Sequence, residues 1–241
     1  MAVDLPLIWA LIILFGVMMY VIMDGFDLGI GLLYPFMPGK AERDTMMNTV
    51  APIWDGNETW LVLGGAGLLA AFPLAYSVIL TAFYLPIIFM LLGLIFRGVA
   101  FEFRFKASDA RRRWWDAAFI GGSLVATFFQ GIVLGGFVGG IKVNGRAYGG
   151  GVLDWLTPFA VFTGVALIVA YALLGCTWLI MKTEGDLQAR MIRLAGPLSW
   201  ALLIATIANS RPQLSGRASR IIRACRSPAV FMMSQVQPRS A

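Results

Sequence analysis

The chain has 241 residues, of which 59% are hydrophobic and only 13% are charged, and its mean hydropathy is +0.78. Soluble domains carry roughly twice this charged fraction, so the composition excludes an ordinary soluble protein and predicts an integral membrane protein. The chain has no histidine and only two cysteines, Cys176 and Cys225, which argues against a zinc, iron–sulfur or histidine-ligated haem site built from this chain alone.

Uncharged stretches long enough to cross a bilayer, about 20 residues, recur along the chain. The first lies within residues 5–23, and no Lys or Arg precedes Lys40, so we expect a membrane helix rather than a cleaved signal peptide. The uncharged run 59–96 is too long for one span and is expected to fold back at Phe72 and Pro73. The pattern predicts helices at about 6–33, 50–71, 75–98, 115–139 and 155–181, and a sixth that begins near Leu194.

Basic residues fall mainly on one side of the predicted bundle. Eleven Lys and Arg residues lie in or beside the connections between helices one and two, three and four, and five and six, whereas the other side has only Lys142 and Arg146. Because positively charged loops remain in the cytoplasm, this side is predicted to be cytoplasmic and the N-terminus to lie outside.

The last 33 residues, 209–241, differ from the rest because they contain six Arg, no Lys and no acidic residue. The whole net charge of +6 therefore belongs to this segment. One interpretation is a basic cytosolic tail that contacts anionic lipid. We favour the other, in which the chain departs here from its proper continuation through truncation or a shifted reading frame.

Four carboxylates are predicted at membrane depth. Asp24 and Asp27 lie near the end of the first helix, and Asp55 and Glu58 lie near the start of the second, so all four are on the cytoplasmic side. Each pair has i, i+3 spacing, which places its members on one helix face. Because a charge at this depth costs several kcal/mol, such groups face the bundle interior or water, and handling of protons or ions is the favoured role. In the alternative, they cap the second helix or pair with Arg97 and hold the bundle together.

Other polar residues support this region. In one interpretation Arg97 is an anchor whose side chain extends to the membrane surface. In the other, it is a counter-ion to the acids or contacts a quinone or lipid headgroup. Glu102 follows on the same helix, Trp54 precedes the second pair of acids, and Asn57 lies between them. Trp54 is also of the residue type that forms interfacial aromatic belts.

The fourth predicted helix carries glycines at four-residue spacing, in the series Gly131, Gly135 and Gly139 and in the pair Gly136 and Gly140. Small residues at this spacing let helices approach closely in lipid, so tight packing is predicted here.

Several motifs occur in a specific order: DGFDLGIG, APIWDGNETW, AAFPLAY, FYLPIIFMLLGLIFRGVAFEFR and FFQGIVLGG. Together they resemble subunit II of the cytochrome bd quinol oxidases over about residues 5–207. The GNETW and GIKVNGRAYGGG segments are similar to the cyanide-insensitive branch. The resemblance is expected to end beyond Ala208.

The resemblance implies an all-α integral membrane fold with eight helices in two four-helix repeats, of which five to six helices are present. Residues 1–145 would form the first repeat, 146–208 the start of the second, and 209–241 an atypical tail. A chain that lacks much of its second repeat is expected to assemble poorly with its partner.

The resemblance also implies a function. Subunit II forms a heterodimer with subunit I, which holds haems b558, b595 and d and the quinol site. The complex in the bacterial inner membrane oxidises quinol, reduces dioxygen to water, takes up cytoplasmic protons and so charges the membrane. This chain would bind no cofactor or metal, have no catalytic residue, contact lipid but no nucleic acid, and have a periplasmic N-terminus. Whether a structural quinone or a small extra subunit binds is left open.

Within the motifs, Asp55 matches the acid that the family places in a proton-uptake route, and Asp24, Asp27, Arg97 and Glu102 match other family positions. Two different functions also stay open: a proton- or ion-coupled transporter, and a scaffold in which the acids only hold helices together. The acids gather toward one membrane face and no broken helix pair repeats, which argues against a transporter.

Overall fold

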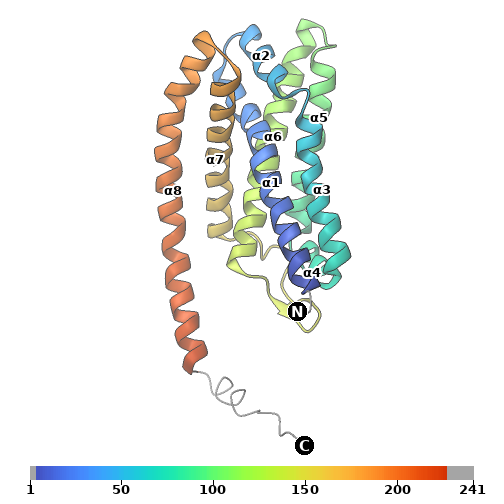
Figure 1. The fold of residues 1–241 in the computed structure, drawn as a ribbon, viewed down its shortest axis with the longest axis vertical. Coiled ribbons are helices and arrows are strands. Elements are labelled where there is room, and N and C mark those ends of the chain that lie inside the picture. Colours follow the sequence, from blue (N-terminus) through green and yellow to red (C-terminus); the bar gives the residue numbers. More distant parts are fainter. Residues whose placement is uncertain (1–3, 227–241) are drawn as a thin grey trace, which may run out of the picture. The chain divides into compact units, whose positions relative to one another are not determined.

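Nearly all of the described chain is helical (Figure 1). The computed structural model describes residues 4–226, and the chain divides into two units, residues 1–202 and 203–241. In chain order the elements are α1 (Leu5–Leu33), the 3-10 helix η1 (Tyr34–Phe36), α2 (Lys40–Val50), α3 (Trp54–Ala71), α4 (Pro73–Ala82), α5 (Tyr84–Arg104), α6 (Asp109–Gly139), β1 (Val143–Asn144), β2 (Ala147–Tyr148), α7 (Pro158–Lys182) and α8 (Gly185–Arg226).

Five helical segments of the described chain are long and apolar enough to cross a membrane, which confirms the all-α, multi-pass fold class. They are Leu5–Phe36, Tyr84–Arg104, Ala110–Gly139, Pro158–Lys182 and Gly185–Ala208. Helix α3 matches the predicted second helix and packs along α1, but its first turns carry Asp55, Asn57 and Glu58, which lower its hydropathy. The β1–β2 hairpin is the one sheet in the described residues.

The structure corrects several predicted boundaries. The predicted loop after the first helix contains α2, whose Met46, Met47 and Val50 are buried. The predicted third helix is divided at Phe83 into α4 and α5, whereas the predicted corner at Phe72 and Pro73 is confirmed. Helix α6 begins at Asp109 and α8 at Gly185, both earlier than expected, because charged residues extend these helices beyond their uncharged runs.

Close helix contacts in the bundle depend on glycine. A Cβ atom at Gly131 would fall 2.5 Å from the Gly164 Cα, and one at Gly135 would fall 2.7 Å from the Ala160 Cα, so α6 and α7 meet backbone to backbone as the spacing predicted. Helix α1 meets α7 in the same way, because a Cβ atom at Gly29 would collide with the Tyr171 carbonyl.

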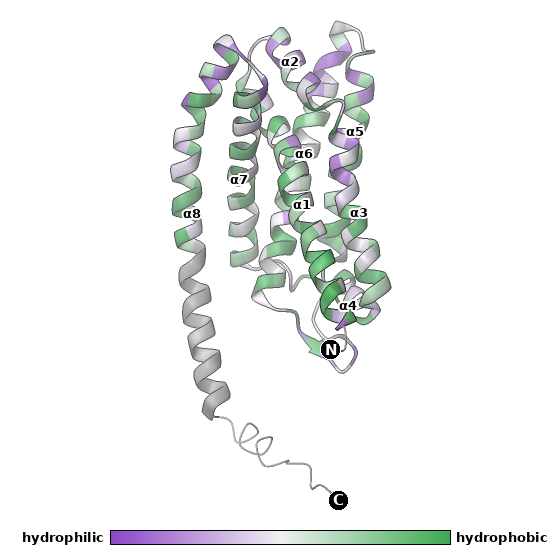
Figure 2. Cartoon of the chain, viewed as in Figure 1, coloured by the Kyte–Doolittle hydropathy of each residue, from purple (hydrophilic) through white to green (hydrophobic). Residues whose placement is uncertain are grey.

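The basic residues gather at one end of the bundle, as predicted. The α1–α2, α5–α6 and α7–α8 connections share this end, which is uppermost in Figure 1, while α4 and the hairpin lie at the other. Hydrophilic residues are concentrated there too (Figure 2). Arg97 and Arg104, counted with the loops in the sequence, are instead fully buried within α5.

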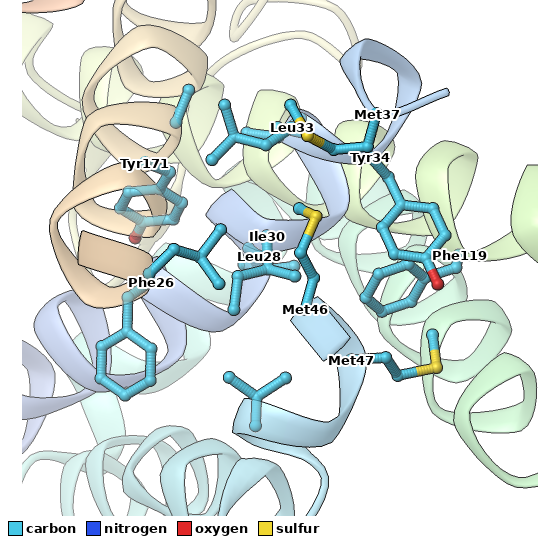
Figure 3. Close-up of a cluster of buried hydrophobic side chains, with 14 of the residues drawn as sticks. Phe26, Leu28, Ile30, Leu33, Tyr34, Met37, Met46, Met47, Phe119 and Tyr171 are labelled. Carbon is cyan, nitrogen blue, oxygen red and sulfur yellow. The ribbon is translucent and has the colours of Figure 1, made fainter. Parts of the chain in front are cut away.

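The larger of two apolar cores packs side chains of α2 against those of α1, α6 and α7 (Figure 3). Its labelled members are Phe26, Leu28, Ile30, Leu33, Tyr34, Met37, Met46, Met47, Phe119 and Tyr171. Helix α2 is therefore a packed part of the fold: its methionines are buried in this core, and its half-buried Arg43 and Asp44 form ion pairs with other helices.

Candidate functional site

Arg97 is the centre of a buried charged cluster. Its Nη1 atom lies 3.4 Å from Asp24 Oδ1 and 3.7 Å from Glu58 Oε2, and its Nη2 atom lies 3.8 Å from Asp27 Oδ2. The Arg97 side chain has no exposed surface, so it does not extend to the membrane surface as an anchor would. The structure thus places the guanidinium of α5 against carboxylates from both α1 and α3.

The carboxylates differ in their access to solvent. Asp24 and Asp27 are fully buried, whereas the Glu58 side chain keeps 28% of its surface exposed. Asn57 is buried and donates a hydrogen bond from Nδ2 to Asp27 Oδ2 over 2.9 Å. The cluster, defined as Asp24, Asp27, Asn57, Glu58 and Arg97, therefore has a closed interior and one partly open side at α3.

Aromatic rings form one wall of this cluster. Trp54 and Phe101 stack with their centroids 5.1 Å apart, and the Arg97 guanidinium carbon lies 5.3 Å from the Phe101 centroid and 6.0 Å from that of Trp54. An aromatic face attracts a cation, which offsets part of the cost of burying Arg97. Trp54 therefore packs against the charged cluster, and its place in an interfacial belt stays a prediction.

Two residues of the predicted site lie outside the cluster. Asp55 is exposed, because it is two positions before the buried Asn57 and so points to the opposite side of α3. Glu102 is also exposed and pairs with Lys106 over 3.5 Å at the surface. Asp55 and Glu58 are three residues apart, as predicted, but only the Glu58 side chain points toward Arg97.

A hydrogen-bonded group that was missed in the sequence adjoins Asp24. Gln130 of α6 donates from Nε2 to the Tyr20 hydroxyl over 2.5 Å, and the Tyr171 hydroxyl of α7 donates to Gln130 Oε1 over 2.9 Å. All three side chains are buried. The available signal was Gln130 itself, because an amide within a long uncharged span needs hydrogen-bond partners.

A second charged cluster was also missed. Arg104 is fully buried and donates hydrogen bonds to Asp116 of α6 and Asp44 of α2, and Arg43 of α2 reaches Asp116 over 3.1 Å. These contacts tie α2 to α5 and α6. Because each of these carboxylates is paired with an arginine of another helix at the end of the bundle, we assign the cluster a structural role.

At the opposite end a cavity of about 430 Å³ lies beside the hairpin, lined among others by Phe83, Lys142 and Trp155. Lys142 Nζ lies 2.9 Å from Asp154 Oδ2 on its rim. This hydrogen bond lowers the pKa of Asp154 and raises the pKa of Lys142. The cavity shares no residue with the Arg97 cluster.

Fold and site together define a class: a multi-pass membrane protein with buried carboxylates facing one arginine near one end of its bundle. Residues 5–234 match the family described as cytochrome bd terminal oxidase subunit II, and the chain belongs to this family. The match continues past Ala208, where the motif resemblance was expected to end. The branch within the family stays a prediction.

Individual relatives agree with this assignment. The chain is 35% identical over 195 residues to the cytochrome bd-I ubiquinol oxidase subunit 2 of Escherichia coli K12, an alignment that covers 77% of this chain and 51% of the relative. It is 33% identical over 193 residues to a probable cytochrome oxidase subunit 2 of Haemophilus influenzae, with the same coverage. It is 31% identical over 209 residues to the cytochrome bd ubiquinol oxidase subunit 2 of Bacillus subtilis, covering 83% of this chain and 60% of the relative. The chain thus spans about half the length of the first two relatives.

Proposed function

We propose that this chain is the non-haem subunit of a quinol-oxidising terminal oxidase, and that its Arg97 cluster takes up cytoplasmic protons for the reduction of dioxygen. The observation that carries the proposal is the buried Arg97 facing Asp24, Asp27 and Glu58. Reduction of dioxygen to water consumes protons together with electrons, so such an enzyme needs a proton supply through the membrane. Two of the relatives are named ubiquinol oxidase subunits.

The cluster has the properties that proton uptake requires. One guanidinium faces three carboxyl groups, so the site has a formal charge of −2 when all three are ionised and becomes neutral when two of them hold protons. The ion-pair distances of 3.4–3.8 Å are longer than typical direct N–H···O hydrogen bonds, so these carboxyl groups are held by charge without being fixed by short hydrogen bonds to Arg97. Glu58 connects the interior to the protein surface, and the exposed Asp55 lies on the preceding turn of the helix.

The direction of uptake follows from charge. Asp24 and Asp27 lie in the last third of α1, Glu58 in the first turns of α3 and Arg97 in the second half of α5, which places the cluster toward the end with the α1–α2 and α5–α6 connections. The positive-inside rule would make this end cytoplasmic. The chain would then sit in the bacterial inner membrane with a periplasmic N-terminus. Residues 1–145 would form the first repeat and residues 146–208 the start of the second.

Electron transfer belongs to another chain in this proposal. Haem iron takes ligands such as histidine, cysteine or methionine. This chain has no histidine, Cys176 is buried among apolar side chains, and Met37, Met46 and Met47 pack within the same core. These described residues are packed in the apolar core and do not form a haem site. In this proposal haems b558, b595 and d are held by subunit I in a heterodimer, and subunit I also binds the quinol.

A scaffold role is the second candidate, because Arg97 pairing also holds α1, α3 and α5 together. Glu58→Gln distinguishes the proton-uptake role from the scaffold role. Glu58 is the partly exposed carboxylate of the cluster, and its replacement leaves Asp24 and Asp27 paired with Arg97. We expect this variant, co-expressed with the haem-bearing subunit, to consume oxygen at least about tenfold more slowly per haem, with haem content retained. The scaffold role predicts an unchanged rate per haem.

Glu102→Gln is the matched control, because it removes an acid that pairs only at the surface. It should leave the oxygen-consumption rate unchanged. Asp55→Asn tests whether protons enter past Asp55. We expect it to lower the oxygen-consumption rate less than Glu58→Gln does, because Asp55 does not face Arg97. Co-purification of the tagged chain with a haem-bearing subunit would support the proposed partnership and contradict the poor assembly expected of a chain with an incomplete second repeat.

A further inference from the structure

Three buried hydrogen-bonding side chains continue from the Arg97 cluster into the bundle. Tyr20 precedes Asp24 by four residues, so both side chains lie on one face of α1, and both are buried. Gln130 and Tyr171 bring α6 and α7 to the same place. A hydrogen-bonded chain from three helices thus ends at Tyr20, one helical turn before Asp24, whose two buried carboxylate oxygens have no hydrogen-bond partner among the described residues.

The direction of these hydrogen bonds leaves one proton available. Gln130 Nε2 donates to the Tyr20 oxygen, so the Tyr20 hydroxyl proton is not used in this bond. Tyr171 donates to Gln130 Oε1, and this contact fixes the amide in the orientation that Tyr20 requires. The Tyr20 hydroxyl is therefore oriented as a donor, and Asp24 is an acceptor one helical turn away.

Packing keeps the group in place. A Cβ atom at Gly25 would lie 2.9 Å from Tyr171 Cε1, so the Tyr171 ring rests directly on the backbone beside Asp24. Tyr20 and Tyr171 are 4% and 1% exposed. The charged or titratable groups that face this place are Asp24 and Asp27 from α1, Glu58 from α3, Arg97 from α5 and Tyr171 from α7.

We propose that Tyr20 is a positioning residue for the proton site: its hydroxyl, held by Gln130 and Tyr171, donates a hydrogen bond to Asp24 and sets the orientation of that carboxyl group. This inference rests on the proposed function of the cluster and deepens it. Arg97 and Tyr20 then hold Asp24 from two sides, one with a charge and one with a neutral donor. Tyr171 acts only through Gln130 and Tyr20.

The first test uses infrared difference spectra of the purified full chain, recorded after a change of pH. The carbonyl band of Asp24 is assigned by its loss in Asp24→Asn, or by its shift in Asp24→Glu if the first variant does not fold. Tyr20→Phe keeps the ring and removes the donor, so this band should move to higher frequency. Tyr34→Phe is the matched control, since it removes a buried hydroxyl that is bonded to the Arg43 carbonyl oxygen and should leave the band in place.

The second test measures oxygen consumption per haem in the complex. Tyr20→Phe should lower the rate about tenfold without changing KM for quinol, the loss expected when a hydrogen bond to a charged group is removed. Tyr171→Phe should lower it less, and the double variant should be no slower than Tyr20→Phe alone, because Tyr171 acts through Tyr20.

The outcomes distinguish two failures. An Asp24 band that stays in place in Tyr20→Phe overturns the positioning role, even if Asp24→Asn slows the oxidase. A normal oxygen-consumption rate in Asp24→Asn overturns the proposed proton route itself, whatever the infrared spectra show. Equal and additive losses for Tyr20→Phe and Tyr171→Phe contradict a path of action through Gln130.

Discussion

At the scale of single residues, Arg97 is the side chain on which the cluster depends. It is fully buried, and the carboxylates that face it lie on two other helices. Removing one member of a buried charge group costs about 3–5 kcal/mol, because the remaining charges lose their partner. The geometry therefore makes Arg97 a stability determinant as well as a part of the proposed proton site.

We expect Arg97→Gln to lower the free energy of unfolding by about 3–5 kcal/mol, because Asp24 and Asp27 remain buried without a cation. Denaturation of the purified chain in detergent, followed by circular dichroism, measures the loss. Arg113→Gln is the control, since Arg113 is exposed on α6 and its loss should change stability by less than about 0.5 kcal/mol. Equal stability of the two variants would show that Arg97 is not needed to balance the acids.

Hydropathy was sufficient to find most members of this cluster but not their directions. Asp24, Asp27, Glu58 and Arg97 interrupt apolar runs, so the cost of burying a charge identified them. Spacing shows which residues share a face but not which face points inward, and Asp55 was therefore placed with Glu58. The Tyr20 and Gln130 pairing joins residues 110 positions apart, and nothing in a single sequence reveals such a contact.

At the scale of helices, close backbone contact positions the charged residues. Gly29 lies two positions after Asp27 and directly against the Tyr171 carbonyl of α7, so the α1–α7 crossing occurs beside the cluster. Glycine spacing predicted tight packing along α6 but not that α7 is the neighbour, and nothing lies within 4 Å of a Cβ atom at Gly139 or Gly140. The segment that forms α2 was predicted to be a loop. Its many charged residues conceal the few buried positions, Met46, Met47 and Val50, that make it a packed helix.

Gly29→Ala should destabilise the chain by about 1–3 kcal/mol, because its methyl group would force α1 away from the α7 backbone, which cannot adjust as a flexible side chain could. Gly56→Ala is the matched substitution in α3, where a Cβ atom meets nothing within 4 Å. It should be neutral or stabilising by up to about 1 kcal/mol, since alanine favours helix. Thermal unfolding of both variants checks the contrast, and a neutral Gly29→Ala would contradict the observed helix crossing.

At the scale of the whole molecule, the distribution of charge predicts how the bundle lies in the membrane. Even without Arg97 and Arg104, which are buried and paired, basic residues are concentrated at the end that holds α2 and the α5–α6 connection. Such asymmetry sets the orientation of short loops during insertion. The Arg97 cluster then faces the compartment from which the oxidase is proposed to take protons.

Labelling of single cysteines tests this orientation. In a chain with Cys176 and Cys225 replaced by serine, Ser108→Cys marks the α5–α6 connection and Asn144→Cys marks the hairpin, and both positions are exposed. A membrane-impermeant thiol reagent should label Asn144→Cys in intact bacterial cells but label Ser108→Cys only after the inner membrane is opened. The reverse pattern would place Glu58 toward the periplasm, and uptake of cytoplasmic protons through Glu58 and Arg97 would then be ruled out.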